Sequence, residues 1–306
     1  MRAIFQDTGA FQQTIGASVT FNGVGLHSGQ QCAATVRPAG ADAGIVFRRL
    51  DLGEGVNEVA ASPRCVRNTR HGTTLAADNG ASVATVEHLL AALRLAGVDN
   101  ARIDVFGPEV PILDGSADIF LNAFNEAGCD LQPAPRRGIA LPDGPFTVRD
   151  GERLIEIVPG ERCVIDITIE FADCIIGRQS LRLDLAAVTD CARMASARTF
   201  CRVEEIDLLR AAGLARGGSL ENSLVVDGEK LLNRSGLRDA QEFALHKALD
   251  LVGDLYLLGV PVLGRIRAVK PGHDLNVRMA QALQDAAEDR SVPAERRARR
   301  SVAALA

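Results

Sequence analysis

The segment HKALDLVGD, residues 246–254, carries three polar side chains whose spacing could serve catalysis. Residues four apart on a helix are displaced by only about 40°, so His246, Asp250 and Asp254 form one narrow polar stripe. Leucine and valine occupy most of the remaining circumference, and a helix that is apolar nearly all round is normally buried. We therefore expect the stripe to face a pocket or a packed neighbour, where imidazole and carboxylate groups need partners.

Two residues of this stripe could bind a metal ion if a third ligand came from elsewhere. An isolated His-x-x-x-Asp is usually only a helical polar pair, and a lone histidine usually has a structural role. His88, in TVEHLLAAL, could supply the third ligand from the other half of the chain. Two imidazoles and one carboxylate, with the fourth position left to water, form a common catalytic zinc set. Zinc lowers the pKa of its water to about 7 and polarises a carbonyl, so this set predicts hydrolysis of an amide or an ester.

Hydrolysis also needs a base that takes the water proton and a group that stabilises the tetrahedral oxyanion. Glu87 is a candidate base because it adjoins a predicted ligand. His273, in the loop KPGHD, is a candidate acid, and Asp254 could hold its imidazole protonated and oriented. No compact motif such as HExxH is present, so the prediction requires that the two halves of the chain meet.

Composition and charge restrict the class of protein. The chain has 306 residues, 47% hydrophobic and 24% charged, as in a soluble globular protein long enough for two domains. Its net charge of -5, without a basic stripe, gives no reason to expect nucleic acid as a partner. Neither a secretory signal nor a run of about 18 apolar residues is present, so we expect a cytoplasmic protein with no transmembrane segment. The seven cysteines are scattered and form no CxxC pair, so a metal would need histidine and carboxylate ligands.

The order of predicted elements indicates an internal duplication. Short strands up to about residue 70 precede a helix over TVEHLLAALRLAG, with Thr85 as its cap and Gly97 at its end. The strand NARIDVF, a proline loop and the helix ADIFLNAFNEAG follow. The second half repeats this order: a long helix that starts at DAQEF with a capping box of Asp239 and Glu242 and ends at Gly259, then the strand VLGRIRAV, the loop KPGHD and the helix NVRMAQALQDAA.

The domain boundary is predicted within LQPAPRRGIALPDGP, residues 131–145, because prolines and glycines concentrate there. We expect an N-terminal α/β domain over residues 1–132, a C-terminal α/β domain over residues 133–287 and a flexible tail over residues 288–306. The tail ends in SVAALA, and an ATP-dependent protease could bind such small apolar residues.

Nine segments match one known family in order over residues 20–280: GVGLHSG, GIVFRRLDL, RNTRHGTTL, TVEHLLAAL, VPILDGSA, ARTF, GGSLENSLVV, LNRSGLRDAQEFALHKALDLVGDL and KPGHDLNVR. The chain resembles the zinc-dependent UDP-3-O-acyl-N-acetylglucosamine deacetylases, which perform the committed step of lipid A biosynthesis in Gram-negative bacteria. The resemblance implies hydrolysis of the substrate's acetamide to UDP-3-O-acyl-glucosamine and acetate. It also implies a monomer with one zinc ion, at a site that accepts Fe²⁺ as well.

The family fold is α+β, with two domains of similar topology, each a β-sheet layer packed on helices, and with the helices sandwiched centrally. The active site lies between the domains. The resemblance implies zinc ligation by His88, His246 and Asp250, and it implies the roles given above for Glu87, His273 and Asp254.

Further site residues follow from the resemblance alone. Thr199 would hydrogen-bond the tetrahedral intermediate, and Lys247 would contact the sugar or the diphosphate. The acyl chain would occupy an apolar passage built by residues 192–219, in which IDLLRAAGL has a helical period. The other positions that match family contacts to substrate are Leu26, Phe200 and Gly218 on the sugar and acyl side, and Phe171, which would stack on uracil, and Lys270 on the nucleotide side.

Two departures from the family bear on substrate fit and not on the metal. Cys201 stands where the family usually has glycine, and Asp173-Cys174 stands where many members have His-Pro. One alternative is a zinc amidohydrolase that acts on a different nucleotide-sugar or acylated amide. A second is a catalytically silent nucleotide-sugar binding module, but the presence of all six polar site residues favours an enzyme.

Overall fold

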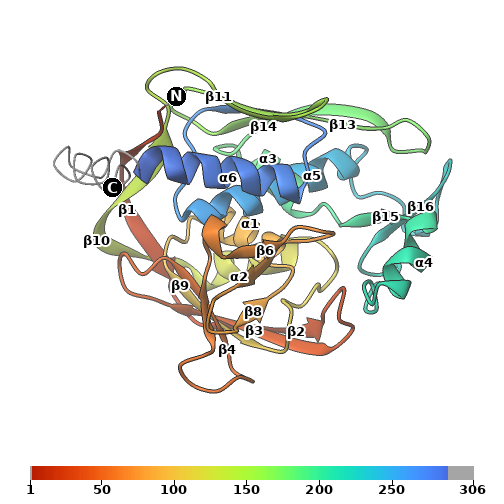
Figure 1. The fold of residues 1–306 in the computed structure, drawn as a ribbon, viewed down its shortest axis with the longest axis horizontal. Helices are drawn as coiled ribbons and strands as arrows, with labels where there is room; N and C mark the ends of the chain where they lie inside the picture. Colours follow the sequence, from red (N-terminus) through yellow and green to blue (C-terminus); the bar gives the residue numbers. More distant parts are fainter. Residues whose placement is uncertain (1, 289–306) are drawn as a thin grey trace, which may run out of the picture.

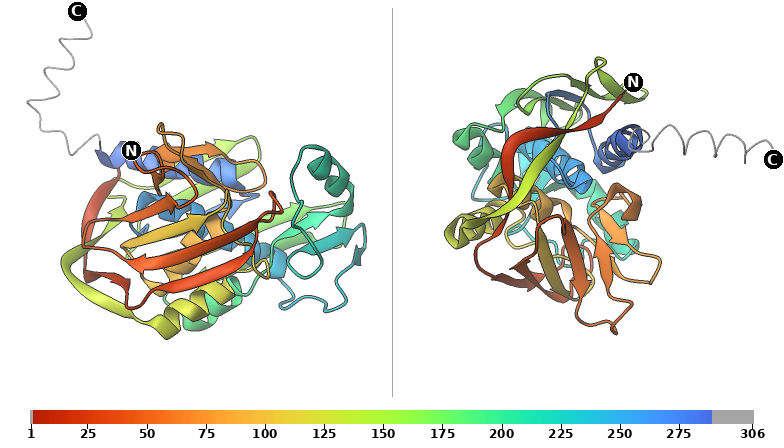
Figure 2. Two further views of the ribbon diagram at one scale, coloured as in Figure 1. Left: turned by 90° about the horizontal axis from the view of Figure 1, so that it is seen from below. Right: turned by 90° about the vertical axis from the view of Figure 1, so that its left-hand side faces the viewer.

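The computed structural model describes residues 2–288, and two five-stranded sheets enclose a central layer of helices (Figures 1 and 2). The first sheet has the order β2 (Val19–Val24), β3 (Gln31–Pro38), β9 (Ala101–Phe106), β4 (Ile45–Arg49) and β5 (Glu58–Ala60). The second has the order β11 (Phe146–Asp150), β12 (Arg153–Val158), β18 (Arg265–Val269), β13 (Val164–Phe171) and β14 (Gly177–Asp184).

The two sheets have the same topology. In the first sheet only β9 and β4 pair in parallel, and in the second only β18 and β13 do. Strand for strand, the connections therefore match, as an internal duplication predicts. The predicted division at residues 132 and 133 leaves one of these sheets on each side.

Each sheet buries one face because its sequence alternates. Along VIDITIEF in β13, Ile165, Ile167 and Ile169 are buried, while the residues between them are partly or fully exposed. Side chains of a strand alternate between its faces, so one face packs on the helices and the other meets solvent. The fold is thus α+β, as the resemblance implied.

The central layer is built on two helices that pack against each other, α1 (Glu87–Ala96) and α5 (Glu242–Leu255). A Cβ atom added to Gly253 of α5 would lie 2.1 Å from the carbonyl oxygen of Glu87, so only glycine permits this approach. The helices α2 (Asp118–Ala127) and α6 (His273–Glu288) flank the pair (Figure 1).

A small three-stranded sheet precedes each central helix. The first consists of β6 (Val66–Asn68), β7 (Thr74–Ala76) and β8 (Ser82–Val83), after the short helix η1 (Pro63–Cys65). The second consists of β15 (Phe200–Arg202), β16 (Leu224–Asp227) and β17 (Lys230–Leu231), and it projects from the body together with α4 (Val203–Ala211) (Figure 1). The helix α3 (Val188–Ala195) leads into it.

The proline-rich segment at the predicted boundary is a strand. β10 (Cys129–Ala140) pairs antiparallel with β1 (Ile4–Ile15), and this ribbon runs along one side of the molecule (Figure 2). A two-stranded ribbon leaves outward N–H positions unpaired, so Pro133 and Pro135 are tolerated, and the register shifts beside Pro135. The predicted tail lies outside the described residues except for Glu288. The protease hypothesis concerns the end of that tail, which also lies outside them.

Both helix starts were predicted wrongly, whereas both ends were correct. Thr85 does not cap α1: its backbone is left-handed (φ 55°), and its hydroxyl donates to Glu109 at 2.7 Å. Asp239 and Glu242 form no capping box, because the N-cap of α5 is Gln241 and the Glu242 carboxylate binds Arg198. Left-handed glycines stop the helices as expected, Gly97 after α1 and Gly259 after α5 and the short helix η2 (Tyr256–Leu258).

Candidate active site

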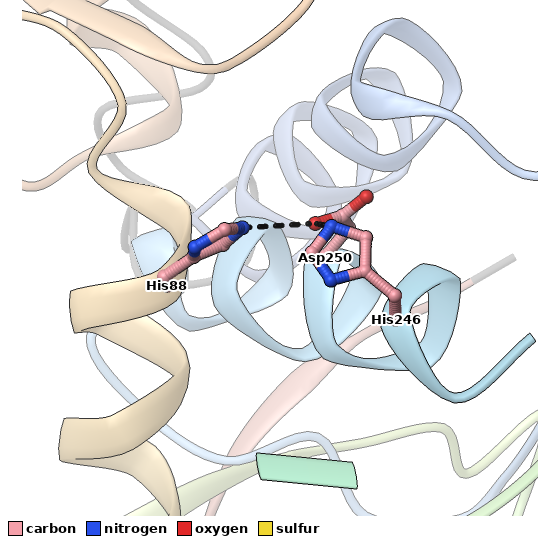
Figure 3. A group of neighbouring side chains, drawn as sticks. All are labelled: His88, His246 and Asp250. Carbon is pink, nitrogen blue, oxygen red and sulfur yellow. Dashed lines mark ion pairs between the residues drawn. The ribbon is translucent and has the colours of Figure 1, made fainter. Parts of the chain in front are cut away.

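Three side chains from the two central helices converge on one point. His88 lies in the first turn of α1, and His246 and Asp250 lie one turn apart on α5 (Figure 3). One ligand atom from each residue lies within 4.8 Å of the others, and all three side chains are buried. The helical stripe therefore meets a third ligand from the other half of the chain, as predicted.

The surroundings prepare these groups to bind a cation. The Nδ1 atom of His246 lies 3.1 Å from the carbonyl oxygen of Ala197, which fixes the proton there and leaves Nε2 3.3 Å from Asp250 Oδ1. Burial lowers the pKa of His246 to about 3, so its imidazole is neutral. Burial opposes ionisation of Asp250, but the positive charges of Lys247 and His273 outweigh it and hold the pKa of Asp250 well below its ordinary value.

Two buried polar atoms of this cluster lack a hydrogen bond among the described residues. They are Asp250 Oδ1 and His88 Nδ1. Burying a charged oxygen without a partner is costly, and Asp250 Oδ1 faces the Nε2 atom of each histidine, 3.7 Å away for His88. A divalent cation would satisfy this oxygen, so the donor set fits a metal ion.

Glu87 and His273 line the same cavity as the cluster. The carboxylate of Glu87 is buried and accepts a hydrogen bond of 2.9 Å from the main-chain N–H of Thr73. Burial raises the pKa of Glu87 above its ordinary value, although His273 and His88 oppose the shift. A carboxylate with a raised pKa is a stronger base than an ordinary one.

His273 is the first residue of α6. The prediction from its Pro-Gly neighbours, that it lies in a loop, was wrong. Its Nδ1–H donates to Asp254 Oδ2 at 2.8 Å. Burial alone would lower the pKa of His273, but the charge of Asp254 outweighs it and raises the pKa to about 9. The imidazole is therefore a cation at neutral pH, and it could donate a proton or stabilise an oxyanion.

One cavity of about 570 Å³ joins these groups to an apolar region. Of the predicted residues, Glu87, His88, His246, Asp250 and His273 line it, and so do Leu26, Phe171, Thr199, Phe200, Gly218 and Lys247. The apolar region is lined by Ile206 and Leu209 of α4, by Val225 of β16 and by Leu232, just after β17.

Two predicted residues do not line this cavity. Asp254 is fully buried and does not reach the cavity, so it could affect the site only through the side chains that it contacts. Lys270 has a left-handed backbone, and its ammonium group pairs with Glu152 at 2.9 Å and with Glu170 at 2.8 Å.

Several residues of the site were not predicted individually. Thr73 and Asn276 donate to Asp254, and His27 and His71 line the cavity. The buried carboxylate of Glu109 accepts from the main-chain N–H of His27 and from the hydroxyl of Thr85. Most of these residues lie within segments quoted above, such as GVGLHSG and RNTRHGTTL, so the signal was the motif and not the residue.

The fold and the site together define an amidohydrolase with a candidate metal centre between two duplicated halves. The family model for UDP-3-O-acyl N-acetylglycosamine deacetylase matches residues 12–285. The chain belongs to this family. No helix in residues 2–288 is long and apolar enough to cross a membrane.

Curated relatives agree with the family model over nearly the whole chain, and each bears the name UDP-3-O-acyl-N-acetylglucosamine deacetylase. The relative from Phenylobacterium zucineum is 46% identical over 275 residues, which cover 89% of this chain and 93% of its own. One from an Anaeromyxobacter species is 46% identical over 87% of this chain and 86% of its own. The relative from Shewanella violacea is 41% identical over 94% of this chain and 95% of its own.

Proposed function

We propose that this protein hydrolyses the acetamide of UDP-3-O-acyl-N-acetylglucosamine in a zinc-dependent reaction, releasing acetate in the committed step of lipid A biosynthesis. The observation that carries the proposal is one cavity lined both by a candidate cation-binding cluster with a base and a protonated imidazole and by apolar side chains of the second half. A substrate with an amide beside a long acyl chain fits both kinds of lining.

His88, His246 and Asp250 would hold the zinc ion, and the same donors also suit Fe²⁺. When bound, the metal lowers the pKa of a coordinated water and polarises the acetamide carbonyl. All other steps belong to side chains of the protein.

Glu87 takes one proton from the attacking water as the new C–O bond forms. His273, held by Asp254, stabilises the charge that develops on the carbonyl oxygen and protonates the amine as the C–N bond breaks. Thr199 hydrogen-bonds the tetrahedral intermediate. The remaining water proton passes from the new carboxyl group to the amine, so the amide and water become acetate and the protonated 2-amine of the sugar. The enzyme returns to its starting state when Glu87 releases its proton and His273 regains one.

The acyl chain would lie between α4 and the small second sheet, in contact with Leu26, Phe200 and Gly218. Lys247 would contact the sugar or the diphosphate. Its ammonium group lies 5.3 Å from the centre of the Phe200 ring and donates to Asp250. Phe171 would stack on uracil. Lys270 would reach a phosphate only by giving up its two carboxylate partners.

The decisive substrate test compares acetate release from UDP-3-O-acyl-N-acetylglucosamine and from UDP-N-acetylglucosamine. Each buried methylene contributes about 0.8 kcal/mol, so loss of the chain should reduce kcat/KM by at least roughly a hundredfold. Equal rates would instead favour an amidohydrolase with a different substrate. Release from neither compound would contradict the proposal.

A further inference from the structure

Thr73 connects the three helices that carry the proposed catalytic groups. It lies just before β7, and its side chain is fully buried. Its main-chain N–H contacts Glu87 of α1, its hydroxyl contacts Asp254 of α5, and the same hydroxyl lies 3.4 Å from Nδ1 of His273 in α6.

The hydroxyl fixes the orientation of Asp254. It lies 2.5 Å from Asp254 Oδ1, and because a carboxylate oxygen only accepts, the hydroxyl is the donor. The other oxygen, Oδ2, accepts from His273 Nδ1 at 2.8 Å and from Asn276 Nδ2 at 2.9 Å. With separate partners on its two oxygens, the carboxylate cannot rotate, so the imidazole that it holds has one orientation.

The main chain of Thr73 fixes the start of α1. Its N–H donates to Glu87 Oε2 at 2.9 Å, and its carbonyl accepts from the N–H of Val86 at 3.3 Å. One oxygen of the base is thereby held and the other, Oε1, stays available. Gly72 leaves room for that oxygen, since an added Cβ would lie 3.0 Å from it.

We propose that Thr73 is a positioning residue that holds the base and the acid of the reaction in register across the two halves of the molecule. The inference rests on the proposed function. The hydroxyl of Thr73 acts on His273 through Asp254, and the main chain of Thr73 acts on Glu87 directly. Substitution of the side chain separates these roles, because any replacement keeps the main-chain bonds.

The kinetic test uses Thr73→Val, which keeps the shape and removes the hydroxyl, and Thr73→Ser, which restores it. A matched control is Thr14→Val, which removes another buried hydroxyl that does not line the cavity and that bonds the carbonyl of Asn100 and the N–H of Ala39. Misplacement of a catalytic group costs up to about a hundredfold, so Thr73→Val should lower kcat roughly 10- to 100-fold with KM nearly unchanged. Metal content should stay at one ion per chain, Thr73→Ser should recover most of kcat, and Thr14→Val should leave kcat unaltered.

Unaltered kcat in Thr73→Val would overturn the proposal, as would failure of Thr73→Ser to restore it. A fall in kcat that only followed metal loss or unfolding would also overturn it. The downfield proton resonance of His273 Nδ1–H, assigned by its loss in His273→Ala, gives a readout independent of turnover. It should shift or broaden in Thr73→Val and return in Thr73→Ser. Absence of acetate release by the unmodified protein would therefore defeat the proposed function alone.

Discussion

The two halves of the molecule insert a small three-stranded sheet at the same point, after the fourth strand of the large sheet in chain order (β5 or β14) and before the central helix (α1 or α5). The first insertion brings polar groups, among them Thr73, against the base and the acid. The second brings apolar groups, such as Leu209 and Val225, to the lining of the cavity. In the proposed function, equivalent places in the two halves would therefore serve catalysis in one half and substrate selection in the other.

The second helices of the two halves differ in the same way. α2 buries Phe120 and Phe124 against Phe21, and none of its residues lines the site cavity. α6 begins with His273, which is the proposed acid. The scaffold therefore does not dictate the chemistry, which depends on the side chains placed at its helix starts.

Loss of the base should have the largest effect. Glu87→Gln keeps the size of the side chain and removes its ability to take a proton, so we expect kcat to fall by about 10²- to 10⁴-fold. Metal binding should persist because Glu87 is not one of the three ligands. Glu126→Gln, at an exposed glutamate of α2, is the matched control and should leave kcat unchanged. Full activity in Glu87→Gln would remove this residue from the mechanism.

Loss of the proton of His273, the proposed acid, should appear as the basic limb of the pH profile of kcat/KM. His273 acts as a cation, and with a pKa of about 9 it is protonated below that pH and loses its proton above it. We therefore expect kcat/KM to fall about tenfold per pH unit on the basic side. A bound metal ion would shift this limb to lower pH. Glu87 must be ionised, and its raised pKa places the acid limb above the ordinary carboxyl range. In His273→Gln the basic limb due to this residue should vanish and kcat should be low at every pH, whereas an unaltered limb would assign it to another group.

The junction between the halves is tested at Gly253. An added methyl group would collide with the Glu87 carbonyl of α1, so Gly253→Ala should force the central helices apart. Overpacking of this kind costs about 1–3 kcal/mol of unfolding free energy, and metal affinity should fall as the ligands separate. Gly40→Ala is the control, because no atom lies within 4 Å of its added Cβ. Titration calorimetry with zinc and thermal unfolding measure both effects, and equal values for the two variants would contradict the close packing.

The smallest effect is expected in the second insertion. Leu209 lines the apolar region, whereas its neighbour Leu208 is 74% exposed and does not. Leu209→Ala should lower kcat/KM for the acylated substrate several-fold, since fewer apolar contacts hold the chain, while metal content stays the same. Leu208→Ala should change neither quantity. A similar loss in both variants would mean that α4 acts through stability and not through the acyl chain.

The sequence could predict features that depend on local periodicity. The stripe of His246, Asp250 and Asp254 follows from helical spacing, and the family motifs identify their partners. Prediction failed where distant residues override local preference. Thr85 does not cap α1 because buried Glu109 takes its hydroxyl, and Glu242 closes no capping box because it pairs with Arg198, 44 positions away. Thr73 carries no signal of its own, since its importance arises only when three helices meet.

We propose that HKALDLVGD is polar along one stripe because it holds a catalytic metal ion. The most direct measurement is acetate release from UDP-3-O-acyl-N-acetylglucosamine by purified protein that has been stripped with a chelator and then given one equivalent of zinc. We expect activity to vanish on stripping and to return with zinc, and not to return in His246→Ala. Full activity in protein shown to be metal-free would contradict the claim and make the stripe structural.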